Sequence, residues 1–157
     1  MSQLPSPRPK GINLRRTYVL VASQYNAKYV QGLIAHCTAE LRALSANTRV
    51  SLRRVPGAFE IPLVVNEIAK KKAADAIIAL GVILEGETAH AQFLGEAITH
   101  SLQQIALQHG VPVIHAVLSL KNESQARKRC LGEKINRGTE AARAAVEMTN
   151  IMARIRR

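Results

Sequence analysis

A glycine, a hydroxyl and an imidazole fall close together at Gly86, Thr88 and His90, where a helix is predicted to begin. Glycine lets the backbone approach a ligand closely, and helix N-terminal amides beside a hydroxyl can bind an anion. His90 can exchange protons near neutral pH. The alternative is that Thr88 only caps the helix and His90 lies on the surface. Glu85 and Glu87 disfavour an anion unless they point away.

A second candidate segment is the corner at Val55–Pro62 (VPGAFEIP), where two prolines and a glycine restrict the backbone. The backbone of Ala58 and the helix start near Glu60 offer polar groups to a flat ligand. Phe59 is expected in the core of a rigid connector.

Two further side chains have open interpretations. Tyr25 follows an apolar run, and its ring can either border the core or stack on a heterocycle. Arg129 belongs to the basic run Arg127–Arg129, and such a run is usually a solvated surface.

Alternating apolar runs and helical periodicities define the elements that position these residues. Strands are predicted at residues 17–23, 49–55, 76–84 and 111–120. Helices are predicted at about residues 26–45, with Asn26 as the cap, then 60–72, 89–109 before Gly110, 123–131 and 138–155. The alternation of strands and helices predicts an α/β fold, a four-stranded parallel sheet with helices on both faces.

Ligands of such sheets bind beyond the carboxyl ends of the strands. The segments in these places are residues 24–26, 56–60, 84–90 and 119–122. Polar, glycine and aromatic residues therefore gather at one edge, where we predict the site.

The chain is predicted to have one domain, residues 17–157, after an extended arm, residues 1–16, that contains Pro5, Pro7 and Pro9. The arm lacks the apolar stretch of a secretory signal, and no apolar run approaches the ~20 residues of a membrane span. The two cysteines have no metal-ligand spacing. We expect a cytoplasmic protein without a membrane partner.

The net charge of +11 raises the question of nucleic-acid binding. Residues 1–16 hold four basic and no acidic side chains, and residues 121–157 hold ten basic and four acidic ones. The excess thus lies at the two ends, and aromatic residues are only 3% of the chain, too few for a base-stacking platform. An anionic substrate together with a solvated basic surface explains the charge more simply, and we expect no nucleic-acid partner.

Four ordered segments resemble the lumazine synthase family. Val55–Pro62 is similar to its V-P-G-[AS]-x-E-[IL]-P signature, and Ala79–His90 to its A-L-G-x-V-I-x-G-x-T-x-H segment. Gly110–Ile114 and Asn136–Ala142 resemble its later G-[VI]-P-V and N-K-G-x-E-A-A stretches. The resemblance covers about residues 17–153.

This resemblance implies a flavodoxin-like three-layer fold and a site between neighbouring subunits of a homopentamer, alone or in an assembly of pentamers. It implies two small-molecule substrates, 5-amino-6-ribitylaminouracil and 3,4-dihydroxy-2-butanone 4-phosphate, which condense to 6,7-dimethyl-8-ribityllumazine with release of phosphate. It implies no cofactor and no metal.

The resemblance also assigns roles by position. Tyr25 would stack on the pyrimidine, Ala58 to Glu60 would bind the ribityl chain and heterocycle, and Val82 and Ile83 would meet the pyrimidine edge. The remaining assignments are Gly86, Glu87 and Thr88 as the phosphate loop, His90 as the catalytic proton-transfer residue, and Arg129 as a neighbour's phosphate ligand.

Four positions depart from the family pattern. His115 stands where phenylalanine often packs over the neighbour's heterocycle, and Ala91 replaces a common aromatic residue. Arg137 replaces lysine, and Ile135 replaces a glycine in the loop before the last helix. The change at Ile135 disfavours a closed icosahedral shell.

Two alternatives remain open. The chain can be a flavin-binding or scaffold paralogue with little activity, against which the joint presence of Thr88, His90 and Arg129 argues. It can also be a pentameric riboflavin synthase of the archaeal type, in which these residues would have no substrate phosphate to bind.

Overall fold

The computed structural model describes residues 3–11 and 14–157, and its centre is a parallel sheet of four strands in the order β2-β1-β3-β4. The strands are β1 (Thr17–Ser23), β2 (Arg49–Val55), β3 (Ala76–Leu84) and β4 (Val113–Leu120). The predicted parallel sheet is confirmed. β4 begins two residues later than predicted, since Pro112 has no amide hydrogen to donate and contributes only its carbonyl, which accepts from the Ile77 amide at 2.9 Å.

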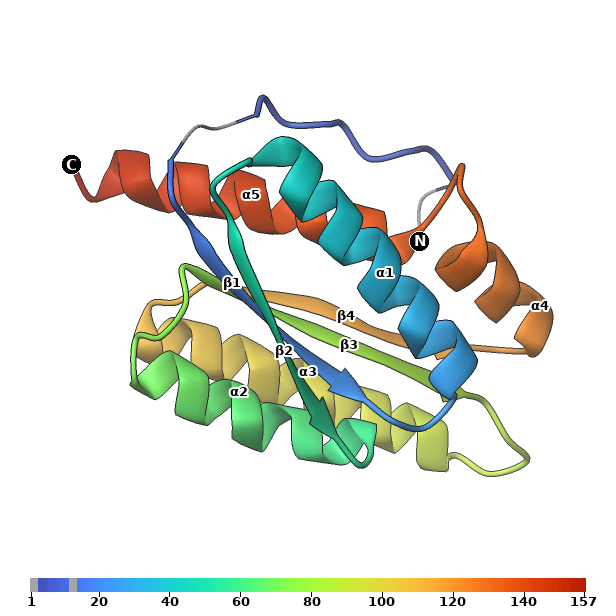
Figure 1. Cartoon of the computed structure of the whole chain (residues 1–157). Helices are drawn as coiled ribbons and strands as arrows, with labels where there is room; N and C mark the ends of the chain where they lie inside the picture. The colour runs from blue at the N-terminus through green and yellow to red at the C-terminus, as the bar shows by residue number, and fades with distance from the viewer. Residues whose placement is uncertain (1–2, 12–13) are drawn as a thin grey trace.

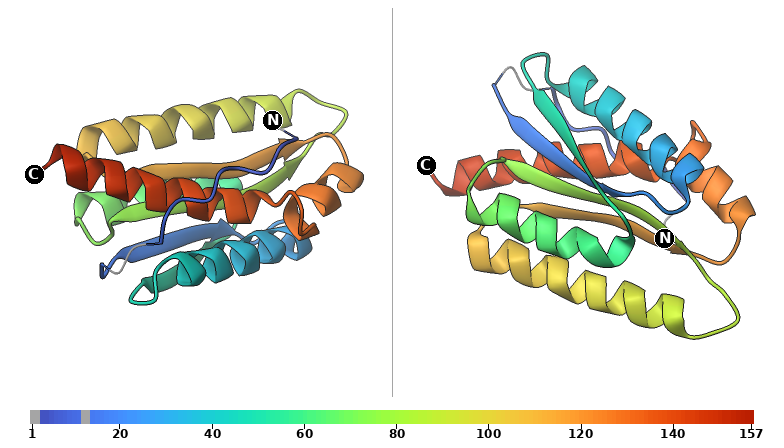
Figure 2. Two further views of the ribbon diagram at one scale, coloured as in Figure 1. Left: turned by 90° about the horizontal axis from the view of Figure 1, so that it is seen from above. Right: turned by 60° about the horizontal axis from the view of Figure 1, so that its bottom comes forward.

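Helices cover both faces of the sheet and complete a three-layer fold, as predicted (Figures 1 and 2). The elements are α1 (Ala27–Leu44), the 3₁₀ turn η1 (Ala58–Glu60), α2 (Ile61–Lys70), α3 (His90–His109), α4 (Glu123–Ala126), the π-helical turn η2 (Arg127–Leu131) and α5 (Arg137–Ile155). The single helix predicted over residues 123–131 is thus α4 followed by η2. Gly110 ends α3 in the left-handed conformation, with φ 64°, as its position predicted.

Two apolar cores lie on the two faces of the sheet. In β1, Tyr18 and Leu20 point toward α1 and α5, whereas Val19 and Val21 point toward α2 and α3. This alternation is the period of two of a strand. β3 is buried along almost its whole length because helices cover both of its faces, which accounts for its unbroken apolar sequence. No helix among the described residues is long and apolar enough to cross a membrane.

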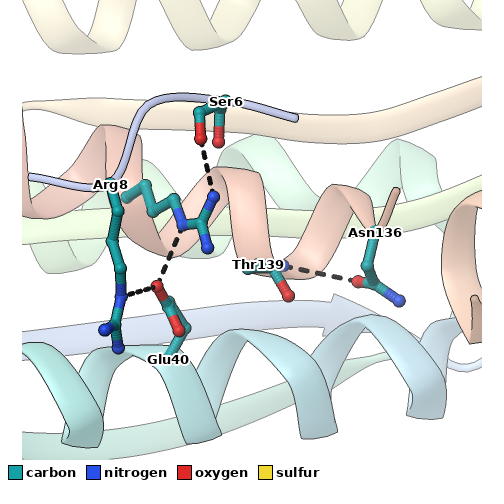
Figure 3. Close-up of polar contacts among 6 residues, drawn as sticks. Ser6, Arg8, Glu40, Asn136 and Thr139 are labelled. Carbon is teal, nitrogen blue, oxygen red and sulfur yellow. Dashed lines mark hydrogen bonds and ion pairs between the residues drawn. The ribbon is translucent and has the colours of Figure 1, made fainter. Parts of the chain in front are cut away.

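The described part of the N-terminal arm has no helix or strand and crosses α1 and α5. Figure 3 shows its attachment: Glu40 Oε1 accepts from Arg8 Nε at 2.8 Å and from Arg143 Nε at 2.9 Å. Arg143 Nη1 also donates to the Ser6 carbonyl at 2.6 Å. One carboxylate therefore ties the arm to both helices. Residues 1–2 and 12–13 of the predicted arm lie outside the described residues.

β2 forms one border of the sheet and, within the described chain, pairs only with β1. Its side chains Arg49, Arg53 and Arg54 are exposed. The border strand of the sheet is therefore strongly basic.

Candidate functional site

A cavity of about 620 Å³ opens at the carboxyl ends of β1, β2 and β3. In the sheet, β2 lies on one side of β1 and β3 lies on the other. The order of the strands therefore reverses at β1 and β3, and doubly wound sheets bind ligands at such a switch point. The residues that line the cavity are Ser23, Tyr25, Asn26, Gly57, Ala58, Phe59, Glu60, Val82, Ile83, Leu84, His90 and Leu94. Seven of them are predicted site residues: Tyr25, Ala58, Phe59, Glu60, Val82, Ile83 and His90.

The loop after β1 forms the first wall. Asn26 occupies the N-cap position of α1, as predicted, and its carbonyl accepts from the Val30 amide at 3.1 Å, but its side chain makes no capping hydrogen bond and its backbone is left-handed (φ 55°, ψ 44°). Its amide Nδ2 instead donates to the carbonyl of Val82 in β3 at 2.8 Å. The Gln24 amide holds the same loop to β2 through the carbonyls of Val55 (3.0 Å) and Pro56 (3.2 Å).

The corner between β2 and α2 forms the second wall. The Gly57 amide donates to Glu60 Oε2 at 2.9 Å, which fixes the carboxylate at the cavity. A methyl group at Gly57 would lie 3.3 Å from ring atoms of Tyr25 and 3.0 Å from that carboxylate oxygen. The glycine therefore allows the aromatic ring to pack against the corner.

Phe59 was predicted to lie in the core, and this is wrong: its side chain is 69% exposed. The 3₁₀ turn at Ala58–Glu60 directs Phe59 outward, and Ile61, which is fully buried, takes the core position. Tyr25, in the loop after β1, is 72% exposed. Two exposed aromatic rings therefore border the cavity.

The floor and the far rim come from β3 and α3. Val82 and Ile83 are buried on opposite faces of the sheet, and both line the cavity. His90 is the exposed first residue of α3 and lies at the rim. The cavity thus combines an apolar floor, two aromatic rings, a carboxylate and an imidazole, which suits a flat heterocycle with a polar substituent.

The loop Gly86–Thr88 is exposed and does not line the cavity. Thr88 is not the cap of α3: the helix begins at His90 after Ala89, and Thr88 Oγ1 only accepts a long contact, 3.4 Å, from the His90 amide. A methyl group at Gly86 would meet nothing within 4 Å. The start of α3 therefore has no strong side-chain cap among the described residues, and its first amides can donate hydrogen bonds to an external anion.

His115 lies on β4 and does not line the cavity. Its Nδ1 accepts from the Val117 amide at 3.1 Å, and its Nε2 lies 2.7 Å from Thr99 Oγ1. Because the Thr99 hydroxyl donates its only proton to the Gly95 carbonyl at 2.7 Å, Nε2 must be the donor in that pair. The imidazole is neutral in this arrangement, and burial lowers the pKa of His115.

Arg129 lies in η2, half-buried and outside the cavity. The next residue, Cys130, is fully buried, and burial raises the pKa of its thiol to about 12 despite the nearby guanidinium. η2 packs against α1 so closely that a methyl group at Gly32 would lie 2.4 Å from the Cys130 carbonyl oxygen. The fold of one chain therefore does not bring Arg129 or His115 to the cavity.

The positions that depart from the family pattern have local roles. Ala91 is buried in the core beneath α3. Arg137 forms an ion pair with Glu140 in the first turn of α5, and Asn136 caps that helix by accepting from the Gly138 amide at 2.9 Å. Ile135 is half-buried in the loop before α5.

The predicted edge of the sheet included Asn26, Gly57 and Leu84 but assigned them no role in the site, and it did not include Ser23 and Leu94. A signal was present for Asn26, since this polar residue belongs to the loop after β1, and β3 is a neighbour of β1 in this topology. No local pattern marks Leu94, which reaches the cavity because it lies one turn after His90 in α3.

Residues 15–153 match the model of the 6,7-dimethyl-8-ribityllumazine synthase family. The chain is 40% identical over 134 residues to a protein of Leptothrix cholodnii named 6,7-dimethyl-8-ribityllumazine synthase, covering 85% of this chain and 84% of that one. It is 37% identical over 134 residues to a protein of the same name from Azoarcus sp. strain BH72, and the match covers 85% of this chain and 83% of that protein. The chain therefore belongs to the 6,7-dimethyl-8-ribityllumazine synthase family and is an enzyme, a transferase of riboflavin biosynthesis.

Proposed function

We propose that the chain condenses 5-amino-6-ribitylaminouracil with 3,4-dihydroxy-2-butanone 4-phosphate to 6,7-dimethyl-8-ribityllumazine. The observation that carries the proposal is the cavity at the β1–β3 switch point, which joins Tyr25, Glu60 and His90 around an apolar floor. The printed names of the two relatives describe synthases of this product.

In this proposal the aminouracil lies between the Tyr25 ring and the ends of β2 and β3. The backbone of Val82 and Ile83 meets the edge of the pyrimidine, where main-chain groups that line the cavity can form hydrogen bonds. Ala58 and the carboxylate of Glu60 bind the hydroxyls of the ribityl chain. Glu60 is prepared for this role by the Gly57 amide, which holds one carboxylate oxygen.

The sugar phosphate binds beyond His90, with its phosphate at the loop Gly86–Thr88 and at the first amides of α3. A second copy of the chain supplies Arg129 to the phosphate and the ring of His115 to the heterocycle. Support comes from the fold, since neither of these two residues lines the cavity of its own chain. A site shared in this way requires a ring of subunits, and we propose a pentamer.

The reaction needs few catalytic groups. The 5-amino group of the uracil attacks the ketone, and loss of water gives an imine. Removal of a proton, assisted by His90, expels phosphate, which the Thr88 loop and Arg129 hold through charge-assisted hydrogen bonds. The enol formed tautomerises to a ketone, the ribitylamino nitrogen closes the ring, and a second water leaves. Both substrates are reactive, so their positioning supplies much of the acceleration.

Chelator-treated, nucleotide-free protein tests the proposal directly. With both substrates it should produce the fluorescent lumazine faster than the same mixture without protein, and release one phosphate for each lumazine. A rate equal to the protein-free rate would overturn the proposal. Tight binding of riboflavin without turnover would favour a flavin-binding paralogue.

A further inference from the structure

Asn26 has a backbone conformation that most residues avoid. Among the described residues, only Asn26 and Lys72 have positive φ without being glycine. Asparagine tolerates the left-handed region better than most residues do. The conformation turns the chain sharply after β1, between the exposed Tyr25 and the start of α1.

The side chain of Asn26 continues the link between β1 and β3 beyond the sheet. The β1–β3 ladder runs from Tyr18 opposite Ala76 to Ala22 opposite Leu80 and then ends, while β3 continues to Leu84. Two residues beyond Leu80, the Val82 carbonyl accepts the hydrogen bond of 2.8 Å from Asn26 Nδ2. This bond crosses the gap between the strands where the cavity opens.

Both ends of this hydrogen bond belong to the cavity wall. Tyr25 directly precedes Asn26, and Val82 forms part of the floor. The opposite side of the Tyr25 loop is held by the Gln24 amide, which donates to the carbonyls of Val55 and Pro56 at the end of β2. The Asn26 bond is therefore the described side-chain link that sets the spacing between the aromatic wall and β3.

We infer that Asn26 is a positioning residue, which holds the Tyr25 ring and the Val82–Ile83 edge at the separation that a flat heterocycle requires. The inference rests on the proposed function. Asn26 acts through Tyr25 and Val82 and takes no part in proton transfer. Loss of the Asn26 side chain should weaken binding of the aminouracil more than it slows the reaction of the bound substrates.

Two substitutions separate the hydrogen bond from the backbone conformation. Asn26→Gly keeps access to positive φ and removes the donor. Asn26→Asp keeps the side-chain shape but places a carboxylate against the Val82 carbonyl. Asn66→Asp is the matched control, because it makes the same chemical change at a residue of α2 that does not line the cavity. There the Asn66 Oδ1 lies 2.9 Å from His109 Nε2.

For Asn26→Gly we expect the KM for the aminouracil to rise about threefold to tenfold, the range for one lost side-chain hydrogen bond. The kcat and the KM for the sugar phosphate should stay within about twofold of the wild type. Asn26→Asp should show the larger effect, and Asn66→Asp none. Equal losses for both substrates, or a wild-type KM in Asn26→Gly, would overturn the positioning role.

A binding measurement distinguishes failure of this inference from failure of the proposed function. The Kd of 6,7-dimethyl-8-ribityllumazine, followed by its fluorescence, should rise in Asn26→Gly by the same factor as the KM. Wild-type protein that binds the lumazine without turnover would overturn the proposed function alone, because the Kd comparison still tests Asn26. Equal Kd values in both proteins would overturn the inference alone, and absence of binding by the wild type would overturn both.

Discussion

Replacing Gly32 with alanine tests how tightly α1 packs against η2. The new methyl carbon would lie 2.4 Å from the carbonyl oxygen of Cys130 and 2.5 Å from Cδ2 of Leu131. Non-bonded contacts of carbon normally lie near about 3.5 Å. The two elements must therefore separate by roughly 1 Å, and the carbonyl is backbone that no rotamer change can move.

The expected magnitude is a balance of two effects. Overpacking of this kind costs about 1–3 kcal/mol, whereas glycine to alanine inside a helix normally gains up to about 1 kcal/mol. We expect Gly32→Ala to lower the free energy of unfolding by about 1–2 kcal/mol, a fall in melting temperature of roughly 2–8 °C for a chain of this size. Thermal unfolding followed by circular dichroism at one fixed protein concentration measures it.

Gly95→Ala is the control. Gly95 also lies inside a helix, α3, but its new methyl group would meet only the Ser119 hydroxyl at 3.0 Å, and that side chain can rotate. Gly95→Ala should melt at or slightly above the wild-type temperature. A Gly32→Ala protein with the same melting temperature as Gly95→Ala would refute the argument, because it would mean that η2 can move away from α1 with no loss of stability.

The remaining predictions concern the proposed site, the arm and the assembly. Arg129→Ala should weaken use of the sugar phosphate about tenfold to a hundredfold, since a charged hydrogen bond is worth roughly 1.5–3 kcal/mol. Steady-state kinetics should show little change for the aminouracil, and equal damage to both substrates would make Arg129 structural. His90→Ala should keep measurable activity with a loss of roughly tenfold, less than a general acid–base group usually costs; complete loss in a folded protein would contradict this. Burial alone would raise the pKa of Glu40, but hydrogen bonds from Arg8 and Arg143 outweigh it and hold the pKa below its ordinary value. The stabilisation is therefore full above the pKa of Glu40 in the unfolded chain and is lost as the pH falls through the lower folded value. Glu40→Gln should flatten that acid dependence in melting curves, and an unchanged dependence would show that the contacts of Glu40 with Arg8 and Arg143 contribute nothing. Analytical ultracentrifugation should find a free pentamer of about 85 kDa from chains of 17.1 kDa; a dominant species near about one megadalton, the mass of twelve pentamers, would contradict it.

The strand limits could be predicted closely because each strand is punctuated by local signals. β2 ends at Pro56-Gly57, and β3 is a continuous apolar run that begins after Asp75. The topology rule then gave the edge of the sheet at which the cavity lies. These predictions needed only residues that are close in sequence.

The errors concern residues whose conformation depends on distant partners. Asn26 occupies the predicted N-cap position, but its side chain donates to a carbonyl 56 positions away in the sequence instead of capping the helix. Phe59 was predicted to be buried as part of a rigid connector, but the 3₁₀ turn gives the core position to Ile61. The π-helical turn η2 has no sequence period of its own, so residues 123–131 were predicted as one regular helix.

The basic border strand has a consequence for self-association. An open sheet border can template pairing with a strand of another molecule, the first step toward ordered aggregates. Three of the seven residues of β2 are exposed arginines, Arg49, Arg53 and Arg54. Two such borders would have to approach to about 4.8 Å, well inside the screening length of about 10 Å at moderate ionic strength. Repulsion between these arginines therefore disfavours the pairing of two β2 borders and protects the chain from fibrillar stacking. Concentrated salt should remove part of that protection.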